Sequence, residues 1–409
     1  MARHGVGIKT ILKAMPGSIN MFQQYSNEVQ ILNIIRRQGP VSRADIAKLT
    51  GLTPPTVTNI INKLLDSKLI TDYMIGESSG GRRPLLLKTN PDAGQVIIIH
   101  IRSFKMIGYV VDATFSVHYE QTVSSKGLGY TAVIEQIQAL IENCRQASKV
   151  PPLAVGIVIR GPVRAQEGIS VFCPNFRWKN VPLKYIIEEK NRLPVFIEND
   201  TNILAYGEYY FGVAKAADNM ILLKVGFGIG GGIMFNGSMY RGISGIAGEV
   251  GHTVIDAAGP LCSCGNTGCL EAMASETALV NLVVNAIEQG QPSIITEILK
   301  GDITTLEPED IYQAADAGDA LAKAMLCRVA EYLGMGIANL VNIFNPELVV
   351  IGGGLAKASK YIEKTVWDTV AQRSFESSSS VLDIKYSTQT SLHTMKGAAD
   401  MVFSELAGK

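Results

Sequence analysis

The sequence predicts an α/β protein in which a small, basic, mainly helical N-terminal domain precedes a larger body of mixed sheets and helices. The first 90 residues combine short helical patterns with an excess of positive charge. From about residue 94 onward, β-branched apolar runs that often close on glycines alternate with helical stretches, which is typical of α/β domains with mixed sheets. A chain of 409 residues is also long enough for two or three domains.

Charge is distributed unevenly along the chain. The net charge is zero, but residues 1–89 contain 12 Lys/Arg and 5 Asp/Glu, a net charge of +7, so the remaining residues carry −7. A basic domain joined to an acidic body predicts a polyanionic partner for the N-terminal domain alone. Composition leaves DNA, RNA and lipid open as that partner.

The N-terminal domain shows three short helical patterns between residues 27 and 70. The first is ended by Gly39-Pro40. Ser42 is a suitable N-cap for the second, SRADIAKLTG. After a short turn with one glycine, Thr53 can cap a third helix. The two prolines that follow it are tolerated, because backbone N–H groups in the first turn of a helix have no partner within the helix. Two helices around such a turn predict a helix-turn-helix.

The third helix and the segment after it carry candidates for contact with double-stranded DNA. Residues 69–71 and 85–87 predict two strands around a loop rich in glycine and arginine, which is a winged arrangement whose arginines could enter a minor groove or clamp phosphates. The predicted DNA-binding residues are Arg43, Pro55, Thr56, Asn59, Lys63, Arg82 and Arg83. The alternative is a small helical bundle with solvated arginines, and the bases that are read stay open.

One histidine and three of the six cysteines are concentrated in a single segment of the body. His252, Cys262, Cys264 and Cys269 have the spacing H-x9-C-x-C-x4-C. Thiolate and imidazole are the ligands that tetrahedral Zn²⁺ prefers, and four of them leave no open position for water. The segment therefore predicts one structural zinc ion per chain. The alternative is four unrelated buried residues, while the dispersed remaining cysteines suit reduced thiols.

Three segments could frame a ligand cleft between two sheet-containing lobes. Asn199 and Asp200 follow an apolar strand and could bind a polyhydroxyl ligand, and Asp200 could act as a general base towards an alcohol or merely cap the next helix. The glycines of residues 226–232 could cradle phosphate or form a tight hairpin. In the zinc segment, Glu249, His252 and Glu271 could present hydrogen-bonding groups to a sugar.

With these motifs in place, the chain resembles the ROK family (repressors, open reading frames and sugar kinases). The matching motifs are IENDTNILAYGEYYFG, VGFGIGGGIMFNGSMYRGISGIAGEVGH, CSCGNTGCLE and IANLVNIFNPELVVIGGG, and they cover most of residues 94–400. The winged N-terminal domain is similar to that of the family's transcriptional repressors, such as the xylose repressors and the glucose and N-acetylglucosamine regulators. The resemblance implies a two-lobed body of the sugar kinase/actin-like (ribonuclease H-like) fold.

The expected domains are three. Residues 1–90 form an N-terminal arm and the winged helix-turn-helix. Residues 91–200 form a small lobe that the C-terminal helix, 392–409, completes. Residues 201–391 form a large lobe with the zinc loop, sugar binding and oligomer contacts.

The resemblance also implies which residues bind the ligands, and it implies that the chain lacks kinase activity. The family's sugar-binding positions match Asn199, Asp200, Glu249, His252 and Glu271, and its zinc ligands match His252, Cys262, Cys264 and Cys269. Asp200 matches the catalytic base of the kinases. However, His100, Arg102 and Phe104 stand where the kinases have the D-x-G-x-T turn that holds ATP phosphates and Mg²⁺, and Arg160-Gly161-Pro162 replaces their Pro-Gly-Pro. This combination implies sugar binding without phosphorylation.

The leading interpretation is therefore a sugar-responsive, non-catalytic repressor of carbohydrate-utilisation genes. A homodimer or tetramer would bind a palindromic operator, and a sugar between the lobes would change that binding. A sugar kinase with an added DNA-binding domain is the alternative, and regulation by a protein partner is a third. Without a signal peptide or an apolar run suited to a membrane, we expect a cytoplasmic protein with no membrane insertion. The effector stays open among xylose, glucose, and N-acetylated or phosphorylated sugars, as does the sign of its effect.

Overall fold

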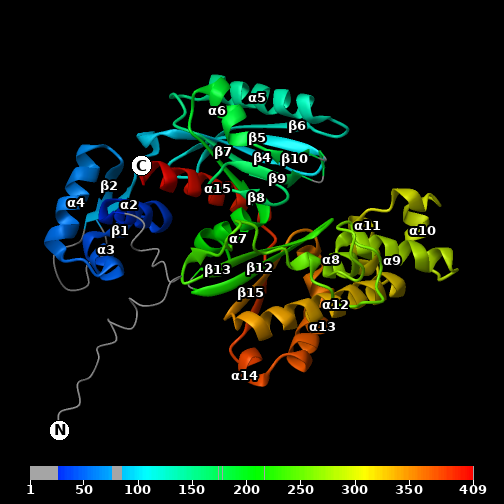
Figure 1. Ribbon diagram of the computed structural model, residues 1–409. Helices are drawn as coiled ribbons and strands as arrows, with labels where there is room; N and C mark the ends of the chain where they lie inside the picture. The colour runs from blue at the N-terminus through cyan, green and yellow to red at the C-terminus, as the bar shows by residue number, and fades with distance from the viewer. Residues whose placement is uncertain (1–25, 76–84, 174, 177, 216, 409) are drawn as a thin grey trace, which may run out of the picture. The chain divides into compact units, whose positions relative to one another are not determined.

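The computed structural model describes residues 26–408 apart from 76–84, 174, 177 and 216 (Figure 1). The chain divides into two compact units. The first, called the head, contains the residues up to Ala93 together with Ser404–Lys409. The second, called the body, is Gly94–Phe403. The boundaries expected for two lobes within the body, at residues 200 and 391, stay predictions.

The head is the predicted winged helix-turn-helix. Its elements are α2 (Asn27–Gln38), β1 (Val41–Ser42), α3 (Arg43–Thr50), α4 (Pro54–Asp66), β2 (Ile70–Ile75), β3 (Leu85–Thr89) and the 3₁₀ turn η2 (Pro91–Ala93). The three strands form an antiparallel sheet in the order β1-β3-β2. The short strand β1 was not expected from the sequence. Its pairing with β3 ties the start of α3 to the wing strands.

The local signals at the helix ends were predictive, with one exception. Ser42 forms a capping box with Asp45, whose backbone N–H donates to the Ser42 hydroxyl at 3.1 Å. Gly51 ends α3 with a φ of 69°, which glycine adopts without steric cost. Thr53 occupies the N-cap position of α4, but its hydroxyl lies 2.9 Å from the Thr56 hydroxyl and makes no capping bond. Thr53 is thus the N-cap residue, as predicted, but its side chain does not satisfy the first N–H groups of the helix.

The head core includes the end of the last helix, α15 (Thr390–Ala407). Ala407 packs against the cluster formed by α2, α3, α4 and the strands. The buried Arg36 side chain donates hydrogen bonds to Ser404 Oγ and Asn33 Oδ1, both at 2.7 Å. Residues at the two ends of the described chain thus share one core.

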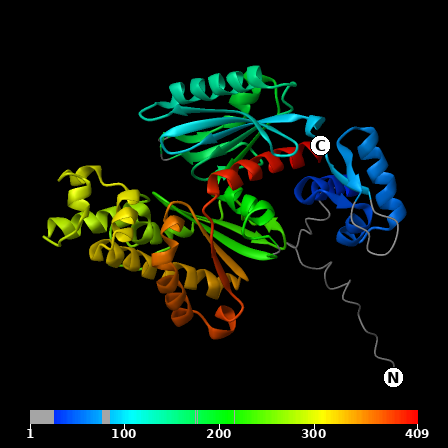
Figure 2. The same cartoon turned by 180° about the vertical axis from the view of Figure 1, so that it is seen from behind.

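The body contains two five-stranded mixed sheets. The first has the order β11-β7-β4-β5-β6, with β4, β7 and β11 parallel and β5 and β6 antiparallel. Its strands are β4 (Gln95–Ile101), β5 (Lys105–Asp112), β6 (Val117–Ser124), β7 (Val155–Ile159) and β11 (Val195–Asn199). The helices α5 (Tyr130–Ala147) and α6 (Leu183–Asn191) cover one face, as Figure 1 shows. On the other face lies α15, drawn in red in Figure 2, where Gly156 leaves room for Val402.

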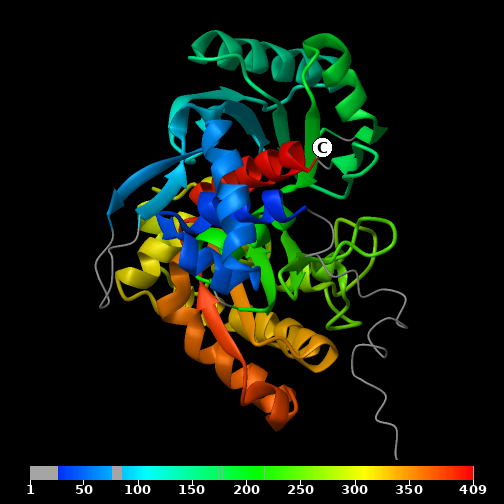
Figure 3. The same ribbon diagram turned by 90° about the vertical axis from the view of Figure 1, so that its left-hand side faces the viewer.

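The second sheet repeats this pattern. Its order is β14-β13-β12-β15-β16, with β12, β15 and β16 parallel. The strands are β12 (Asn219–Val225), β13 (Ile229–Phe235), β14 (Ser238–Met239), β15 (Leu348–Gly352) and β16 (Asp383–Tyr386). Helix α7 (Asp200–Phe211) packs on one face. The other face is covered by a helical core in which α12 (Ala320–Phe344) and α13 (Ser359–Arg373) lie side by side (Figure 3).

Smaller elements complete the body. They are the sheet β8 (Val163–Arg164), β9 (Ile169–Cys173) and β10 (Trp178–Val181), the helices α8 (Leu270–Ala274), α9 (Glu276–Glu288), α10 (Ile295–Ile298), α11 (Pro308–Asp316) and α14 (Glu376–Ser379), and the 3₁₀ turns η3 (Val250–His252), η4 (Ile303–Thr305) and η5 (Leu355–Ala358). The two sheets carry helices on both faces, so their central strands are buried throughout.

One expectation about apolar runs needs correction. Helix α12 is long and apolar enough, by length and composition, to cross a membrane. Many of its apolar side chains, among them Leu333, Ile337 and Val341, are fully buried in the core beneath the second sheet, whereas Ile343 near its end is exposed. Core helices of this kind meet the same criterion, so one such helix is weak evidence for a span.

Candidate ligand cleft and metal site

A single cleft of about 1480 Å³ in the body collects all of the predicted sugar-binding residues. Asn199 and Asp200 reach it from the junction of β11 and α7. Glu249 directly precedes η3, His252 ends η3, and Glu271 lies at the start of α8. Two of the predicted metal ligands, Cys262 and Cys264, also line this cleft. Segments far apart in the sequence therefore meet where the motifs predicted a ligand.

Asn199, rather than Asp200, caps helix α7. Asn199 Oδ1 accepts hydrogen bonds from the backbone N–H groups of Thr201 at 2.8 Å and Asn202 at 3.1 Å. Its Nδ2 donates to the Gly161 carbonyl at 2.8 Å, which fixes the residue to the loop after β7. The view of Asp200 as a simple helix cap is thus wrong, and its carboxylate faces the cleft.

The Asp200 carboxylate is paired with Lys224, a residue that sequence reasoning missed. Lys224 lies on β12, and its Nζ forms a hydrogen-bonded ion pair with Asp200 Oδ2. Burial alone would raise the pKa of Asp200, but the charge and hydrogen bond of Lys224, with a smaller effect of Arg160, hold that pKa below its ordinary value. A carboxylate stabilised in this way is a poor proton acceptor. One sequence signal existed, since Lys224 is the sole charged residue of the strand NMILLKV.

The turn between β4 and β5 occupies the place expected for a phosphate-binding turn. It is a tight hairpin in which the Arg102 N–H donates to the Lys105 carbonyl at 2.9 Å. At its tip, the Phe104 ring meets the Phe227 ring edge-to-face, with centroids 6.4 Å apart. Phe227 belongs to the turn between β12 and β13, so aromatic rings from the two sheets touch at the cleft.

The glycine-rich segments of the body make room for a buried carboxylate. Glu276 donates its backbone N–H to the Gly226 carbonyl at 2.8 Å, and a Cβ on Gly354 would lie 1.9 Å from Glu276 Oε1. That oxygen accepts a hydrogen bond from the Tyr312 hydroxyl at 2.8 Å. Burial raises the pKa of Glu276. Residues 226–228 form the turn of the β12–β13 hairpin, so packing accounts for these glycines.

The four predicted metal ligands come together. The ligand atoms of His252, Cys262, Cys264 and Cys269 all lie within 4.8 Å of one another. Cys264 Sγ and Cys269 Sγ are 3.7 Å apart, and Cys262 Sγ is 3.6 Å from His252 Nδ1. A tetrahedral ion with bonds of about 2.3 Å to sulfur and about 2.0 Å to nitrogen requires a sulfur–sulfur distance of about 3.8 Å and a sulfur–nitrogen distance of about 3.5 Å. The cluster can therefore hold a metal ion.

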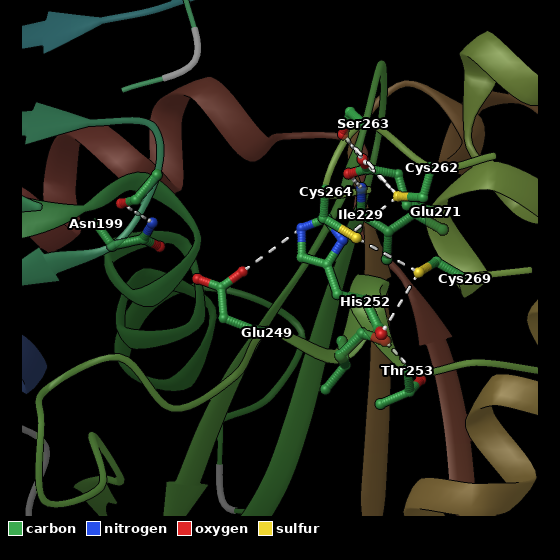
Figure 4. A network of polar contacts seen from close by, with 12 residues as sticks. Asn199, Ile229, Glu249, His252, Thr253, Cys262, Ser263, Cys264, Cys269 and Glu271 are labelled. Atoms are coloured by element: carbon green, nitrogen blue, oxygen red, sulfur yellow. Dashed lines mark hydrogen bonds and ion pairs between the residues drawn. The ribbon is translucent and has the colours of Figure 1, made fainter. Parts of the chain in front are cut away.

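His252 lies between Glu249 and the three cysteines of the cluster, as Figure 4 shows. Its Nδ1 faces Cys262, and its Nε2 is 3.9 Å from Glu249 Oε2. Partial burial raises the pKa of Glu249, the nearby Glu271 carboxylate adds to that effect and His252 opposes it. Glu271 is anchored by the Ile229 N–H and the Ser263 hydroxyl, both at 3.0 Å.

In the head, the predicted DNA-binding residues differ in their surroundings. Pro55 and Asn59 are exposed on α4, and Thr56 is half-buried rather than fully outward. Arg43, the first residue of α3, is also half-buried. Lys63 is exposed but paired with Glu28 of α2 at 2.7 Å. Such an exposed ion pair is weak, so Lys63 remains available to another anion. Arg82 and Arg83 lie outside the described residues.

Comparison with known proteins decides the family. The profile of the ROK family matches residues 97–405, and the profile of winged helix-turn-helix DNA-binding domains matches residues 26–71. The chain belongs to the ROK family. The body cleft, the His/Cys cluster and the head are thus the parts of a ROK protein.

Relatives within the ROK family include regulators and kinases. A xylose repressor from Caldicellulosiruptor bescii is 34% identical over 391 residues, which cover 93% of this chain and 96% of the repressor. The crystal structure of a ROK transcriptional regulator, a homologue of the E. coli Mlc protein, has a TM-score of 0.80 at 29% identity and covers 95% of this chain and 98% of its own. A ROK glucokinase from Streptomyces griseus, solved with glucose and AMPPNP, has a TM-score of 0.67 at 28% identity. The match covers 75% of this chain and 99% of the glucokinase.

Proposed function

We propose that this chain is a sugar-responsive DNA-binding transcriptional repressor of carbohydrate-utilisation genes. Its layout supports this function, because a winged helix-turn-helix head and a ROK body share one chain, and a xylose repressor matches this chain over nearly its whole length. The pairing of Lys224 with Asp200 carries the proposal. The cleft keeps side chains suited to sugar hydroxyls, while Asp200, the residue that matches the catalytic base of the kinases, is neutralised by a lysine.

In this proposal the cleft residues have specific roles. The sugar is bound by Asn199, Asp200, Glu249, His252 and Glu271. One zinc ion per chain, held by His252, Cys262, Cys264 and Cys269, fixes the loop that carries these groups. Because all four ligands come from the protein, the ion is structural. The repressor is cytoplasmic and a homo-oligomer, since two heads are needed to read a palindrome.

DNA binding is tested by selecting sequences from a random double-stranded pool with the full chain. We expect enrichment of an inverted repeat whose half-sites lie one helical turn, about 10 base pairs, or a multiple of it apart. Asn59→Ala should weaken binding by about 1–3 kcal/mol and relax one position of each half-site. Asn62→Ala, further along α4, serves as the matched control. A pool without an enriched sequence contradicts the proposal.

A sugar kinase is the second candidate function, favoured by the buried Asp200 in the cleft and by the likeness to a glucokinase. The structure gives three reasons to expect no turnover. Lys224 neutralises Asp200, the Phe104 and Phe227 rings meet at the turn that stands in place of the kinases' phosphate-binding turn, and the Glu276 carboxylate lies against the glycine turns. A coupled ADP-release assay with hexoses and pentoses should show no sugar-dependent rate. A rate that Asp200→Asn abolishes would establish the kinase instead.

A further inference from the structure

One buried carboxylate of the body does not line the ligand cleft but holds two of the segments that do. Glu198 is the residue of β11 directly before Asn199, and its side chain is fully buried. Its Oε1 accepts the backbone N–H of Asn199 at 2.8 Å and the Nδ2 group of Asn202 at 3.1 Å. These bonds fix the end of β11 and the first turn of α7, from which Asn199 and Asp200 reach the cleft.

The other oxygen of Glu198 holds a segment that is distant in the sequence. Arg241 Nε donates a hydrogen bond to Glu198 Oε2 at 2.9 Å. Arg241 begins the 241–248 loop, which connects β14 to Glu249 and then to η3. Residues 245–248 of this loop line the cleft. Glu198 is therefore a bridge between the strand that ends on Asn199 and the loop that leads to Glu249.

The 241–248 loop is not held by apolar packing. Both of its isoleucines are exposed, Ile243 fully so. Arg241 is its only charged residue. At the end of the loop, the Gly231 N–H donates to the Gly248 carbonyl at 2.8 Å. The start of the loop is thus held by the ion pair with Glu198, and its end by a backbone hydrogen bond to β13.

We propose that Glu198 is a positioning residue of the sugar site, which acts through Arg241 and does not touch the sugar. This role rests on the proposed sugar response. A binding site works best when its side chains are held in the productive geometry by neighbours that are themselves fixed. Hydrogen bonds in which one partner is charged are about twice as strong as neutral ones, so the Glu198 carboxylate is suited to this task. It fixes Asn199 and Glu249 relative to each other, although they come from separate segments.

Glu198→Gln tests this role with almost no change of shape. The amide oxygen can still accept from Asn199 and Asn202, but the amide NH₂ group then faces the Arg241 Nε–H, which is also a donor. Sugar affinity, measured by isothermal titration calorimetry on the full chain, should fall about tenfold. The probe is whichever of xylose, glucose, N-acetylglucosamine, glucose 6-phosphate and N-acetylglucosamine 6-phosphate binds the unmodified chain most tightly.

Glu142→Gln is the matched control. Glu142 lies on α5 and does not line the cleft, and its partner Arg145 has a side chain that is 37% exposed, against 38% for Arg241. The same chemical change beside an arginine of equal exposure should leave sugar affinity unchanged.

A double-mutant cycle separates positioning from a general loss of stability. Arg241→Met leaves the Glu198 carboxylate buried without its cation, so both the thermal unfolding temperature and sugar affinity should fall. The double variant Glu198→Gln/Arg241→Met no longer buries an unpaired charge, so its unfolding temperature should recover most of that loss. Its sugar affinity should stay about tenfold below that of the unmodified chain, whereas two independent contributions would multiply to about a hundredfold.

The outcomes distinguish this role from the function on which it rests. An unchanged sugar affinity in Glu198→Gln, a loss of about a hundredfold in the double variant, or an affinity that recovers together with the unfolding temperature would each overturn the role of Glu198 and leave the sugar response intact. If the unmodified chain binds none of the probes, the sugar response fails for these ligands and the positioning role fails with it.

Discussion

Replacing Cys264 with alanine is expected to abolish stable metal binding and, with it, the effect of sugar on operator affinity. Cys264 is exposed, so the substitution leaves no cavity and its effect comes from the lost ligand alone. Three remaining ligands cannot close a tetrahedral shell. Without the ion, the loop that places His252 and Glu271 in the cleft loses its fixed shape. Metal content per chain and operator affinity with and without sugar measure the two losses.

The matched control for this variant is Cys327→Ala. Cys327 is a partly exposed cysteine outside the cluster, and its replacement should leave metal content and sugar response unchanged. Treating the unmodified chain with a chelator should reproduce the Cys264→Ala result. A chain that loses its metal ion yet keeps a normal sugar response would separate the ion from the sensor and contradict its proposed role.

The second large effect is expected at the ion pair between Lys224 and Asp200. Lys224→Met leaves a carboxylate whose side chain is only 9% exposed without its cation. We expect the free energy of unfolding at pH 8 to fall by about 1–3 kcal/mol, because the buried Asp200 carboxylate is then desolvated without a compensating cation. Urea denaturation measures the change. Lys357→Met breaks the exposed pair with Glu309 and should cost at most about 1 kcal/mol.

The same variant should change how stability depends on pH. With Lys224 present, the pKa of Asp200 lies below its ordinary value of 3.8, so its contribution to stability is present above about pH 4 and is lost on further acidification. Without Lys224, burial dominates and raises that pKa above the unfolded value. Stability of the variant then falls as pH rises, and its deficit relative to the unmodified chain should be larger at pH 8 than at pH 5. An equal deficit at both values would show that Lys224 does not control Asp200.

The features that sequence reasoning predicted well depend on local rules. The capping box at Ser42 and the left-handed Gly51 involve residues within a few positions of each other, so spacing alone defined the helix-turn-helix. The metal ligands likewise lie close together in the sequence, so residue type and spacing were enough to predict that they form one cluster. The family resemblance then placed Asn199, Glu249 and Glu271 in one cleft, and the structure brings these residues together there.

The features that were missed depend on contacts between distant segments. Lys224 meets Asp200 only because β12 faces the start of α7, and no local pattern encodes that pairing. The contact of Phe104 with Phe227 and the enclosure of Glu276 by glycine turns also join elements of different sheets and helices. Asn199 and Asp200 are neighbours that can both cap a helix, so the sequence did not decide between them.

The most direct test of the sensor is operator affinity measured by fluorescence anisotropy with and without saturating sugar. In the unmodified chain we expect the effector to change the Kd for the selected operator by about 5- to 150-fold, the usual range of coupling between two sites. Glu249→Ala should lose most of this change, since Glu249 lines the cleft, whereas Glu288→Ala, at an exposed glutamate of α9, should retain it. A sugar that binds the chain without changing operator affinity, or a full response in Glu249→Ala, would contradict the account.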